Sequence, residues 1–483
     1  MASNTTSSNL TAAFVDLATY DEPEKYMYGG NDAVTYFVKK LRKATWFSVA
    51  PTVLSISGGN PGFGQSWGYK ISRAGDYLLR TWLRVSLPAV KLAGTTGSTV
   101  TGTSWAWEQC GLRWTRNLGH NLIKEINISF NDLVAERMDS YYLDFWAGFT
   151  VPAGKRNGYN NMIGNVPQLV DPTSVYGTSG TYNVRSLPPA ILNIPLPFFY
   201  SRDTGVSLPT AAIPYNDMVH YLTFRDLGEV LNLDNIKWAS IPGFSGQYTV
   251  PVQRSMLEDS NPQLQCDMWA EYAIVSNVER TQMGKAPRDI LIEQVQTAPK
   301  TQFVPANTSN TDIRFAHSIK ALFFAVRNKT VTSEQSNYTA AQPVPTETGM
   351  NFTPILAADP VRQTSLYYES TARLVNMGSD YFSLIVPWYT AVSIPTETGM
   401  HLLSYTLDLV NTAPMGSTNY GKLTNVSFRF DASNASIASA AATYSVANAS
   451  AGAPVAQTFE TVVVGLNHNI IRISGGALGF PIL

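Results

Sequence analysis

Short stretches in which apolar and polar residues alternate recur along most of the chain. In the clearest of them the alternate positions on one face are Leu79, Thr81, Leu83, Val85 and Leu87. Successive side chains of a β-strand point to opposite sides, so this alternation predicts a strand with one buried face. Similar patterns lie at 126–130, 218–224, 268–274, 313–321, 426–430, 462–466 and 470–473. Strands this numerous, separated by turns rich in Gly, Pro, Asn and Ser, predict antiparallel β-sandwiches.

Length and composition narrow the class of protein. A chain of 483 residues corresponds to roughly two to four domains, or to two large β domains. Hydrophobic residues make up 44%, which excludes global disorder, while only 14% are charged, against about 25% in an average soluble protein. The net charge of −1 weighs against a dedicated nucleic-acid-binding protein and against strong attraction to anionic membranes. Such a surface is covered by uncharged polar groups or is buried against neighbours.

Helical patterns are few. Asp132 is placed to cap a helix over 133–147, where apolar residues recur at three- and four-residue steps. A second, charged helix is expected over 280–290, and because it lies between two β-rich halves it is the candidate linker. Residues 1–26 are expected to form an arm that is disordered or lies along a partner. Loops that form interaction surfaces are expected in the long polar segments 91–109, 164–186, 228–265, 327–366 and 431–457.

Targeting and redox signals are weak. The start of the chain lacks both a basic region followed by an apolar run and a glycine at position 2, so neither a signal peptide nor myristoylation is expected. No apolar run approaches about 18 residues, so no membrane span is predicted. Cys110 and Cys266 form no disulfide framework and fit a reducing compartment, although one bridge between them stays open. The Asn-x-Ser/Thr sequons are expected to be unmodified.

Metal, cofactor and catalytic sites each require particular residues at a defined spacing. A metal site needs several ligands at short spacing, and the five histidines occur singly, without HxH or CxxC, at His120, His220, His317, His401 and His468. The glycine-rich stretch 58–64 contains neither GxGxxG nor GxxxxGK and is interpreted as a turn. GxSxG occurs once, as GQSWG at 64–68, but an alternating strand pattern follows it and not the helix that a catalytic serine turn requires. We therefore predict no catalytic, cofactor-binding or metal-binding residues, no cofactor, and no enzyme activity.

Three weaker features have structural interpretations. Cys110 could be a reactive thiol, but a buried structural thiol is favoured. Glu258 and Asp259 are interpreted as a solvated loop and not as a glycosidase pair. The basic run 39–43, which is flanked by aromatic residues, could grip single-stranded nucleic acid, but an edge-strand or interface cluster is favoured.

One turn has a specific prediction. In the segment 73–77, Gly75 is expected to adopt a positive φ between two strands, and Asp76 is expected to accept hydrogen bonds from nearby backbone amides. Replacing Gly75 by valine should therefore impair folding.

A series of longer stretches resembles one known family. In order they are FVDLATYD (14–21), MYGG (27–30), ISRAGDY (71–77), LPFFYSRDTG (196–205), IEQVQ (292–296), GSTNYG (416–421), NHNIIRI (467–473) and GFPIL (479–483). On these stretches, from about residue 14 to residue 483, the chain resembles the major capsid proteins of iridoviruses, within the nucleocytoplasmic large DNA viruses.

The resemblance implies an all-β double jelly roll, in which two eight-stranded antiparallel β-sandwiches carry short helices and long loops. It divides the chain into an arm (1–26), a first jelly roll (27–279), a linker (280–290) and a second jelly roll (291–483). It implies a structural role, with homotrimers forming pseudo-hexameric capsomers that tile the icosahedral shell of a virion assembled in the host cytoplasm. The implied partners are neighbouring capsomers, minor capsid proteins under the shell, a penton protein at the vertices and an internal membrane beneath the shell. It implies no direct contact with nucleic acid.

Two other functions stay open at this point. A carbohydrate-binding sandwich could use Trp105 and Trp107 to stack on sugar rings, and it is compatible with a capsid role. A jelly-roll hydrolase is disfavoured because the one GxSxG, at 64–68, is not followed by a helix. On the capsid hypothesis, trimers form through large apolar walls, and trimers meet through smaller polar ones.

Overall fold

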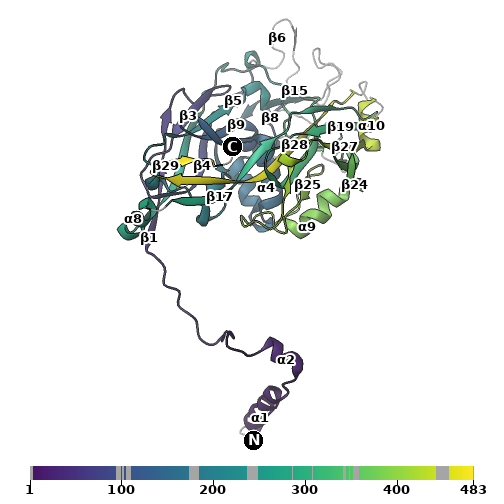
Figure 1. Ribbon diagram of the computed structural model, residues 1–483. Coiled ribbons are helices and arrows are strands. Elements are labelled where there is room, and N and C mark those ends of the chain that lie inside the picture. Colours follow the sequence, from purple (N-terminus) through teal and green to yellow (C-terminus); the bar gives the residue numbers. More distant parts are fainter. Residues whose placement is uncertain are drawn as a thin grey trace. The chain divides into compact units, whose positions relative to one another are not determined.

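The computed structural model describes residues 4–93, 99–100, 103–104, 110–172, 184–235, 249–285, 287–306, 308–340, 344–346, 349–351, 358–441 and 456–481 (Figure 1). Contacts divide the chain into two units, Met1–Trp46 and Phe47–Leu483. The first unit contains α1 (Asn4–Ala18) and α2 (Glu22–Met27), and Asp21 begins α2 with a capping box. The basic run 39–43 is exposed and belongs to no strand, so the edge-strand interpretation is wrong.

Residues 47–275 form a first antiparallel sandwich. One sheet has the order β1 (Phe47–Val53), β16 (Gln265–Val275), β4 (Tyr77–Leu87) and β12 (Ala190–Leu196). The other has the order β10 (Leu133–Asp139), β9 (Ile123–Phe130), β13 (Met218–Phe224), β3 (Ser66–Lys70) and β2 (Ser55–Ser57). The alternation that predicted β4 is observed, because Leu83, Val85 and Leu87 are buried in the core.

Residues 288–479 form a second antiparallel sandwich. Its larger sheet has the order β17 (Arg288–Thr297), β28 (Phe459–Ser474), β20 (Ser318–Asn328) and β25 (His401–Ser404), with β18 (Thr301–Phe303), β26 (Thr418–Asn419) and β29 (Ala477–Gly479) at its margins. The opposite sheet has the order β19 (Ser309–Ile313), β27 (Val426–Ala432), β23 (Val361–Tyr368) and β24 (Thr371–Gly378). Two successive antiparallel sandwiches are thus observed, as the alternation predicted.

The connections carry short elements. Small sheets join β5 (Val90–Lys91) to β11 (Ser186–Leu187), β6 (Thr99–Val100) to β7 (Thr103–Ser104), β8 (Cys110–Trp114) to β14 (Leu231–Asn235) and β15 (Thr249–Pro251), and β21 (Val344–Thr346) to β22 (Gly349–Asn351). The α- and π-helices are α3 (Leu118–Leu122), α4 (Ser140–Thr150), α5 (Ala153–Ile163), α6 (Pro167–Val170), α8 (Asn277–Lys285), η8 (Tyr381–Ile385), α9 (Val386–Thr390) and α10 (Asn434–Ala440). The 3-10 turns are η2 (Phe199–Ser201), η3 (Thr204–Val206), η4 (Thr210–Ala212), η5 (Leu227–Glu229), η7 (Arg254–Met256) and η9 (Tyr420–Lys422). No described helix is both long and apolar enough to cross a membrane.

The helix predicted over 133–147 is wrong in its first half, where the chain forms β10. Asn131 and Asp132 both adopt positive φ angles, 47° and 66°, and they form the two-residue turn of the β9–β10 hairpin. Positive φ at both central positions is typical of hairpin turns, and Asn and Asp tolerate it. The helix α4 begins later, and its cap is Asp139, whose carboxylate accepts a 2.9 Å hydrogen bond from the Tyr142 amide.

Strand β20 is buried on both faces. Leu322, Phe324 and Val326 belong to the core of the second sandwich, while Phe323 belongs to the core that also fills the first sandwich. The ring of Phe323 packs on three aromatic rings of α4, at Tyr142, Phe145 and Phe149. A strand covered on both sides is expected to read as a continuous apolar run, which is what residues 321–326 show. This strand joins the two sandwiches.

The turn at position 75 requires glycine, but for a different reason from the predicted one. Gly75 does not have a positive φ, but a Cβ placed on it would lie 2.4 Å from the Cβ of Tyr272. Glycine is therefore required by the approach of β16. The prediction for Asp76 is confirmed, since its carboxylate accepts a 2.9 Å hydrogen bond from the Val275 amide.

Asp76 also connects β4 to the helix after the first sandwich. Arg280 of α8 donates to both carboxylate oxygens at 2.7 and 2.9 Å, and these bonds hold the pKa of Asp76 below its usual range. The interval 280–290, predicted as a linker, comprises the end of α8 and the start of β17. The domain boundaries at 27, 279 and 291 stay predictions.

Candidate functional site

The contact between the two sandwiches contains a buried polar segment, residues 331–340, which follows β20. It lies within 327–366, which was predicted to be a loop forming an interaction surface. The structure instead buries five consecutive polar side chains, Ser333, Glu334, Gln335, Ser336 and Asn337. Buried polar groups require partners, and four of these five hydrogen-bond side chains of the first sandwich. The segment therefore attaches one half of the molecule to the other.

An ion triad forms the first part of this contact. Arg113 of β8 donates to Asp234 of β14 at 2.5 Å and to Glu334, and the three side chains are almost fully buried. Thr249 donates to the same aspartate at 2.6 Å. Burial alone would lower the pKa of Arg113, but the two carboxylates more than offset it, so the pKa lies above its usual range. The guanidinium stays charged, and removing either partner leaves a buried charge unbalanced.

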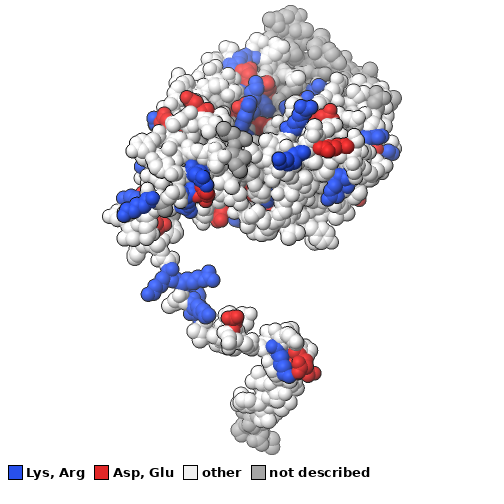
Figure 2. Space-filling view, in the orientation of Figure 1, with Lys and Arg blue, Asp and Glu red and all other residues white. Residues whose placement is uncertain are grey.

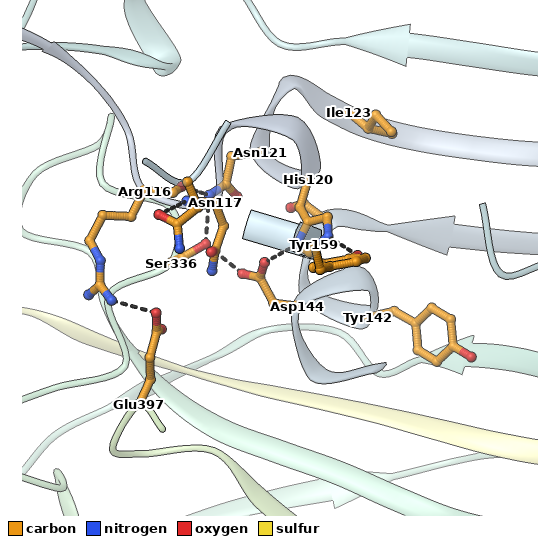
Figure 3. Close-up of polar contacts among 12 residues, drawn as sticks. Arg116, Asn117, His120, Asn121, Ile123, Tyr142, Asp144, Tyr159, Ser336 and Glu397 are labelled. Atoms are coloured by element: carbon orange, nitrogen blue, oxygen red, sulfur yellow. Dashed lines mark hydrogen bonds and ion pairs between the residues drawn. The ribbon is translucent and has the colours of Figure 1, made fainter. Parts of the chain in front are cut away.

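A second network centres on Asp144 of α4 (Figure 3). Its carboxylate accepts hydrogen bonds from Ser336 and, at 2.9 Å, from Tyr338, and it lies 2.7 Å from Nδ1 of His120. The other ring nitrogen of His120 lies 2.7 Å from the hydroxyl of Tyr159. A nucleophilic serine needs a histidine as its base, but Ser336 donates to the aspartate itself. These residue types therefore do not form a catalytic relay here.

A second serine, histidine and aspartate cluster lies in the second sandwich. The Oγ of Ser379 lies 2.9 Å from Nε2 of His401, and Oδ2 of Asp359 lies 2.8 Å from the same nitrogen. In a relay the aspartate contacts the opposite ring nitrogen, but within the described part of the chain Nδ1 of His401 is buried without a partner. Burial would raise the pKa of Asp359, but His401 and its hydrogen bonds outweigh it, so the pKa is lowered. This cluster also lacks relay geometry.

The remaining histidines are dispersed, as their spacing indicated. His220 is buried 3.1 Å from the Tyr200 hydroxyl, and burial lowers its pKa to about 3. His317 occupies a turn with φ of 63°, and burial lowers the pKa of His468. Among the residues that the structure describes, no three His, Cys, Asp or Glu side chains converge as metal ligands would.

The other sequence candidates also occupy structural positions. Cys266 is a buried thiol whose pKa burial raises to about 12, which makes it unreactive. Glu258 forms an exposed ion pair with Lys91 at 2.8 Å. The glycine-rich stretch 58–64 follows β2 and leads to β3 as a turn, as predicted. The side chain of Cys110, together with Trp105 and Trp107, lies outside the described residues.

Sequence reasoning missed the 331–340 segment because it has the Ser, Thr, Asn and Gln content of a surface loop. Its partners are more than 190 residues away in most cases, so no local spacing connects them. One signal was present, namely the apolar run of β20 immediately before it. A strand buried on both faces leads into a segment that starts inside the molecule.

A solvent-exposed apolar surface surrounds η8 and α9, and we call it the α9 surface. Its exposed members are Leu384, Ile385, Trp388, Tyr389, Val392 and Leu407. Residues 381–392 contain no charged side chain, and charged side chains are also sparse on the face of the folded unit in Figure 2. Contiguous exposed apolar residues of this kind mark protein contact sites.

Two antiparallel sandwiches in one chain, joined by a buried polar contact, define a double jelly-roll protein. The "PBCV-1 virus capsid, quasi-atomic model" matches with a TM-score of 0.67 and 18% identity over 93% of this chain and 100% of that one. The "Faustovirus major capsid protein" has a TM-score of 0.67 and 10% identity over 92% and 93% of the two chains. These similarities confirm the predicted double jelly-roll fold.

Sequence comparison identifies the family. Residues 35–274 match the family model "Major capsid protein N-terminus", and residues 279–479 match "Large eukaryotic DNA virus major capsid protein". The major capsid protein of Costelytra zealandica iridescent virus is 53% identical over 99% of both chains. That of Lymphocystis disease virus 1 is 45% identical over 99% of both, and that of Frog virus 3 is 41% identical over 100% of both. The chain belongs to the major capsid protein family of the iridoviruses.

Proposed function

We propose that three copies of this chain form a pseudo-hexameric capsomer, and that these capsomers tile the icosahedral outer shell of a large DNA virus. The observation that carries the proposal is the 53% identity to an iridescent virus major capsid protein over 99% of both chains. Two sandwiches in one chain give a trimer six similar walls, which suits near-hexagonal tiling. The protein acts by burying surfaces and not by chemistry, in keeping with the two serine, histidine and aspartate clusters that lack relay geometry.

The α9 surface supplies a wall for the trimer in this proposal. Obligate contacts between subunits are large and comparatively apolar, and aromatic side chains contribute most of their stability. Trp388 and Tyr389 are 73% and 78% exposed in the single chain, which leaves two large rings in water. Burial against a second copy removes that cost. The absence of charge over 381–392 keeps the desolvation cost of the contact low.

The exposed side chains of the arm, residues 1–26, are the basis for proposing contacts beneath the shell. Leu10, Phe14 and Leu17 lie on one side of α1 at four- and three-residue steps, and each is exposed. An apolar stripe along one side of a helix favours docking onto a protein partner. We assign this stripe to minor capsid proteins, above an internal membrane, in particles assembled in the host cytoplasm with a penton protein at the vertices. Residues 27–279 and 291–483 are the two jelly rolls in this proposal, joined by 280–290.

Light scattering and electron microscopy of the purified full-length chain test the proposal. The expected mass is three times the 52.9 kDa of one chain, and the expected images show trimers with a hexagonal outline. A stable monomer at micromolar concentration would contradict the trimer. Trimers that never associate into a lattice, even with the minor proteins of the same virus, would contradict the shell.

A further inference from the structure

A cavity of about 690 Å³ lies where the two sandwiches meet, and its walls carry an excess of cations. Strands β9 and β10 and the start of α4 form one side, while β17, β20 and the start of β28 form the other. Its basic side chains are Lys124, Arg137, Arg225, Lys300, Arg327 and Lys329. We call this cavity the basic cleft.

The acidic residues of the basic cleft already form ion pairs or accept hydrogen bonds from backbone amides. Glu125 pairs with Arg137, and Glu460 lies 2.8 Å from Arg327 and 3.7 Å from Lys300. The two other carboxylates, Asp139 and Glu229, accept hydrogen bonds from backbone amides at 2.9 and 3.1 Å.

Two lysines of the basic cleft are not paired with any of these acidic residues. Lys124 and Lys329 form no ion pair with any described residue. The cleft therefore presents uncompensated cations on both of its sides, since Lys124 belongs to β9 and Lys329 follows β20.

Two buried guanidinium groups point to a ligand independently of the lysines. Arg225 is 6% exposed and donates to the carbonyls of Asn121 and Ile123 and to the hydroxyl of Ser140. Its charge interacts with the carboxylate of Asp139 but forms no ion pair with any described residue. Arg327 is also 6% exposed, and its Nε is buried without an acceptor in the part of the chain that the structure describes. A buried N–H without an acceptor is costly, and an anion in the cleft would satisfy it.

The cations are held in place by one aromatic ring. Tyr141 lies at the wall of the cleft, with the Lys300 ammonium 4.1 Å from its ring centroid and the guanidinium carbons of Arg327 and Arg225 at 5.6 and 5.8 Å. The Tyr141 hydroxyl donates to Gln335 of the 331–340 segment at 3.2 Å. Cations gathered on a buried ring are positioned before any ligand arrives, which lowers the entropic cost of binding.

We propose that the basic cleft binds a small polyanion that carries several phosphate-type groups. The volume lies within the range of about 300–1,000 Å³ that is typical of small-molecule sites. Phosphate groups match the chemistry of the walls, because guanidinium and ammonium groups bind them through charge-assisted hydrogen bonds. A ligand in the cleft contacts both sandwiches, so it stabilises their attachment to each other.

Calorimetric titration of the full-length chain with sodium tripolyphosphate tests this proposal, with thermal unfolding as a second readout. We expect binding with a one-to-one stoichiometry per chain and a rise in the unfolding temperature. The double variant Lys124→Gln, Lys329→Gln should bind about a hundredfold more weakly, because each lost charge-assisted contact corresponds to about tenfold in affinity. The matched control is Lys155→Gln, Lys422→Gln, which removes two exposed lysines outside the cleft and should bind like the unmodified chain.

Four results would overturn the proposal. One is no binding of tripolyphosphate at millimolar concentration. Another is equal weakening in both double variants, which would indicate a general charge effect. The third is a trimer structure in which a polypeptide segment fills the cleft. Sulfate binding as tight as that of tripolyphosphate would exclude a polyanion as the ligand class. The measurement is made on the soluble chain, so its outcome is independent of whether the chain assembles into shells.

Discussion

Single residues in this molecule are constrained mainly by what approaches them from distant parts of the chain. Gly75 was predicted to be required by its own backbone angle, yet it is required by Tyr272, almost 200 positions away. Asp76 was predicted to bind backbone amides, and it does, but it also binds Arg280. Local reasoning thus identified the residues that matter and could not identify the partners that make them matter.

Replacing Gly75 by alanine tests the close approach. We expect a loss of about 1–3 kcal/mol in the free energy of unfolding, because the new methyl group overlaps the side chain of Tyr272. The control is Gly158→Ala in α5, where the space around the new methyl group is open. That change should stabilise the protein by about 0.5–1 kcal/mol, since alanine favours helix. Urea unfolding measures both, and equal effects of the two changes would contradict the explanation.

Replacing Glu334 by glutamine tests the contribution of the buried ion triad to stability. We expect Glu334→Gln to destabilise the protein by about 3–5 kcal/mol, because it leaves the buried charge of Arg113 under-compensated. Glu258→Gln removes an exposed ion pair and should change stability by less than about 1 kcal/mol. The change in stability is measured from the urea concentration at the midpoint of unfolding, with the dependence of the unfolding free energy on urea concentration unchanged. A small effect of Glu334→Gln would mean that Asp234 alone balances the guanidinium.

The buried His220 predicts a dependence of stability on pH. Its pKa in the folded protein is about 3, below the ordinary value of about 6.5, so the unfolded chain binds the extra proton between these two values. The contribution is fully present above about pH 6.5 and is lost as the pH falls toward 3, by about 1.4 kcal/mol per pH unit. His220→Gln should reduce this slope. Chemical unfolding at a series of pH values measures the slopes, and identical slopes in the unmodified protein and in His220→Gln would contradict the assignment.

At the scale of elements, most strands were predictable and their environment was only partly so. The strand predicted over 313–321 is interrupted by a turn at 314–317, where His317 has a positive φ, between β19 and β20. The alternation of β4 predicted its buried face, and the apolar run at 321–326 agrees with the burial of β20 on both faces. The helix predicted over 133–147 failed because the Asn131-Asp132 turn and the pairing of β10 with β9 override the helical spacing. The 331–340 segment was predicted as surface because its composition cannot reveal partners in another sandwich.

Replacing an exposed aromatic residue of the α9 surface tests whether this surface forms the trimer contact. We expect Trp388→Glu to shift the protein from trimer to monomer, because a charge replaces a ring that a neighbouring copy would bury. Val278→Glu in α8 is the control, since Val278 is also on a helix and is 71% exposed. Light scattering across a concentration series measures the shift. An unchanged trimer in Trp388→Glu would place the contact elsewhere.

At the scale of the whole molecule, the two sandwiches share one core. Residues of both halves belong to the same buried apolar cluster, and the 331–340 segment adds buried hydrogen bonds across the contact. The double jelly roll and the family were recognisable from the sequence, because both depend on patterns that extend over the whole chain. The polar network was not recognisable, because it depends on how two separately patterned halves meet.

The shared core predicts that residues 47–483 unfold as one cooperative unit. Fluorescence and circular dichroism should report the same transition, as in two-state unfolding. Phe323→Ala should lower the stability by about 3–5 kcal/mol without splitting the transition, because its ring packs on α4 from the other half. Two separate transitions in the unmodified protein would show that the halves are energetically independent.

The double burial of β20 has a consequence for synthesis on the ribosome. The rings of Phe145 and Phe149 on α4 emerge roughly 170 residues before Phe323 covers them, an interval of about 10–35 s at ordinary translation rates. During that interval the nascent first half exposes an aromatic face with no partner. Molecular chaperones recognise such faces, so the order in which this chain is made creates a need for chaperone protection that the finished protein no longer has.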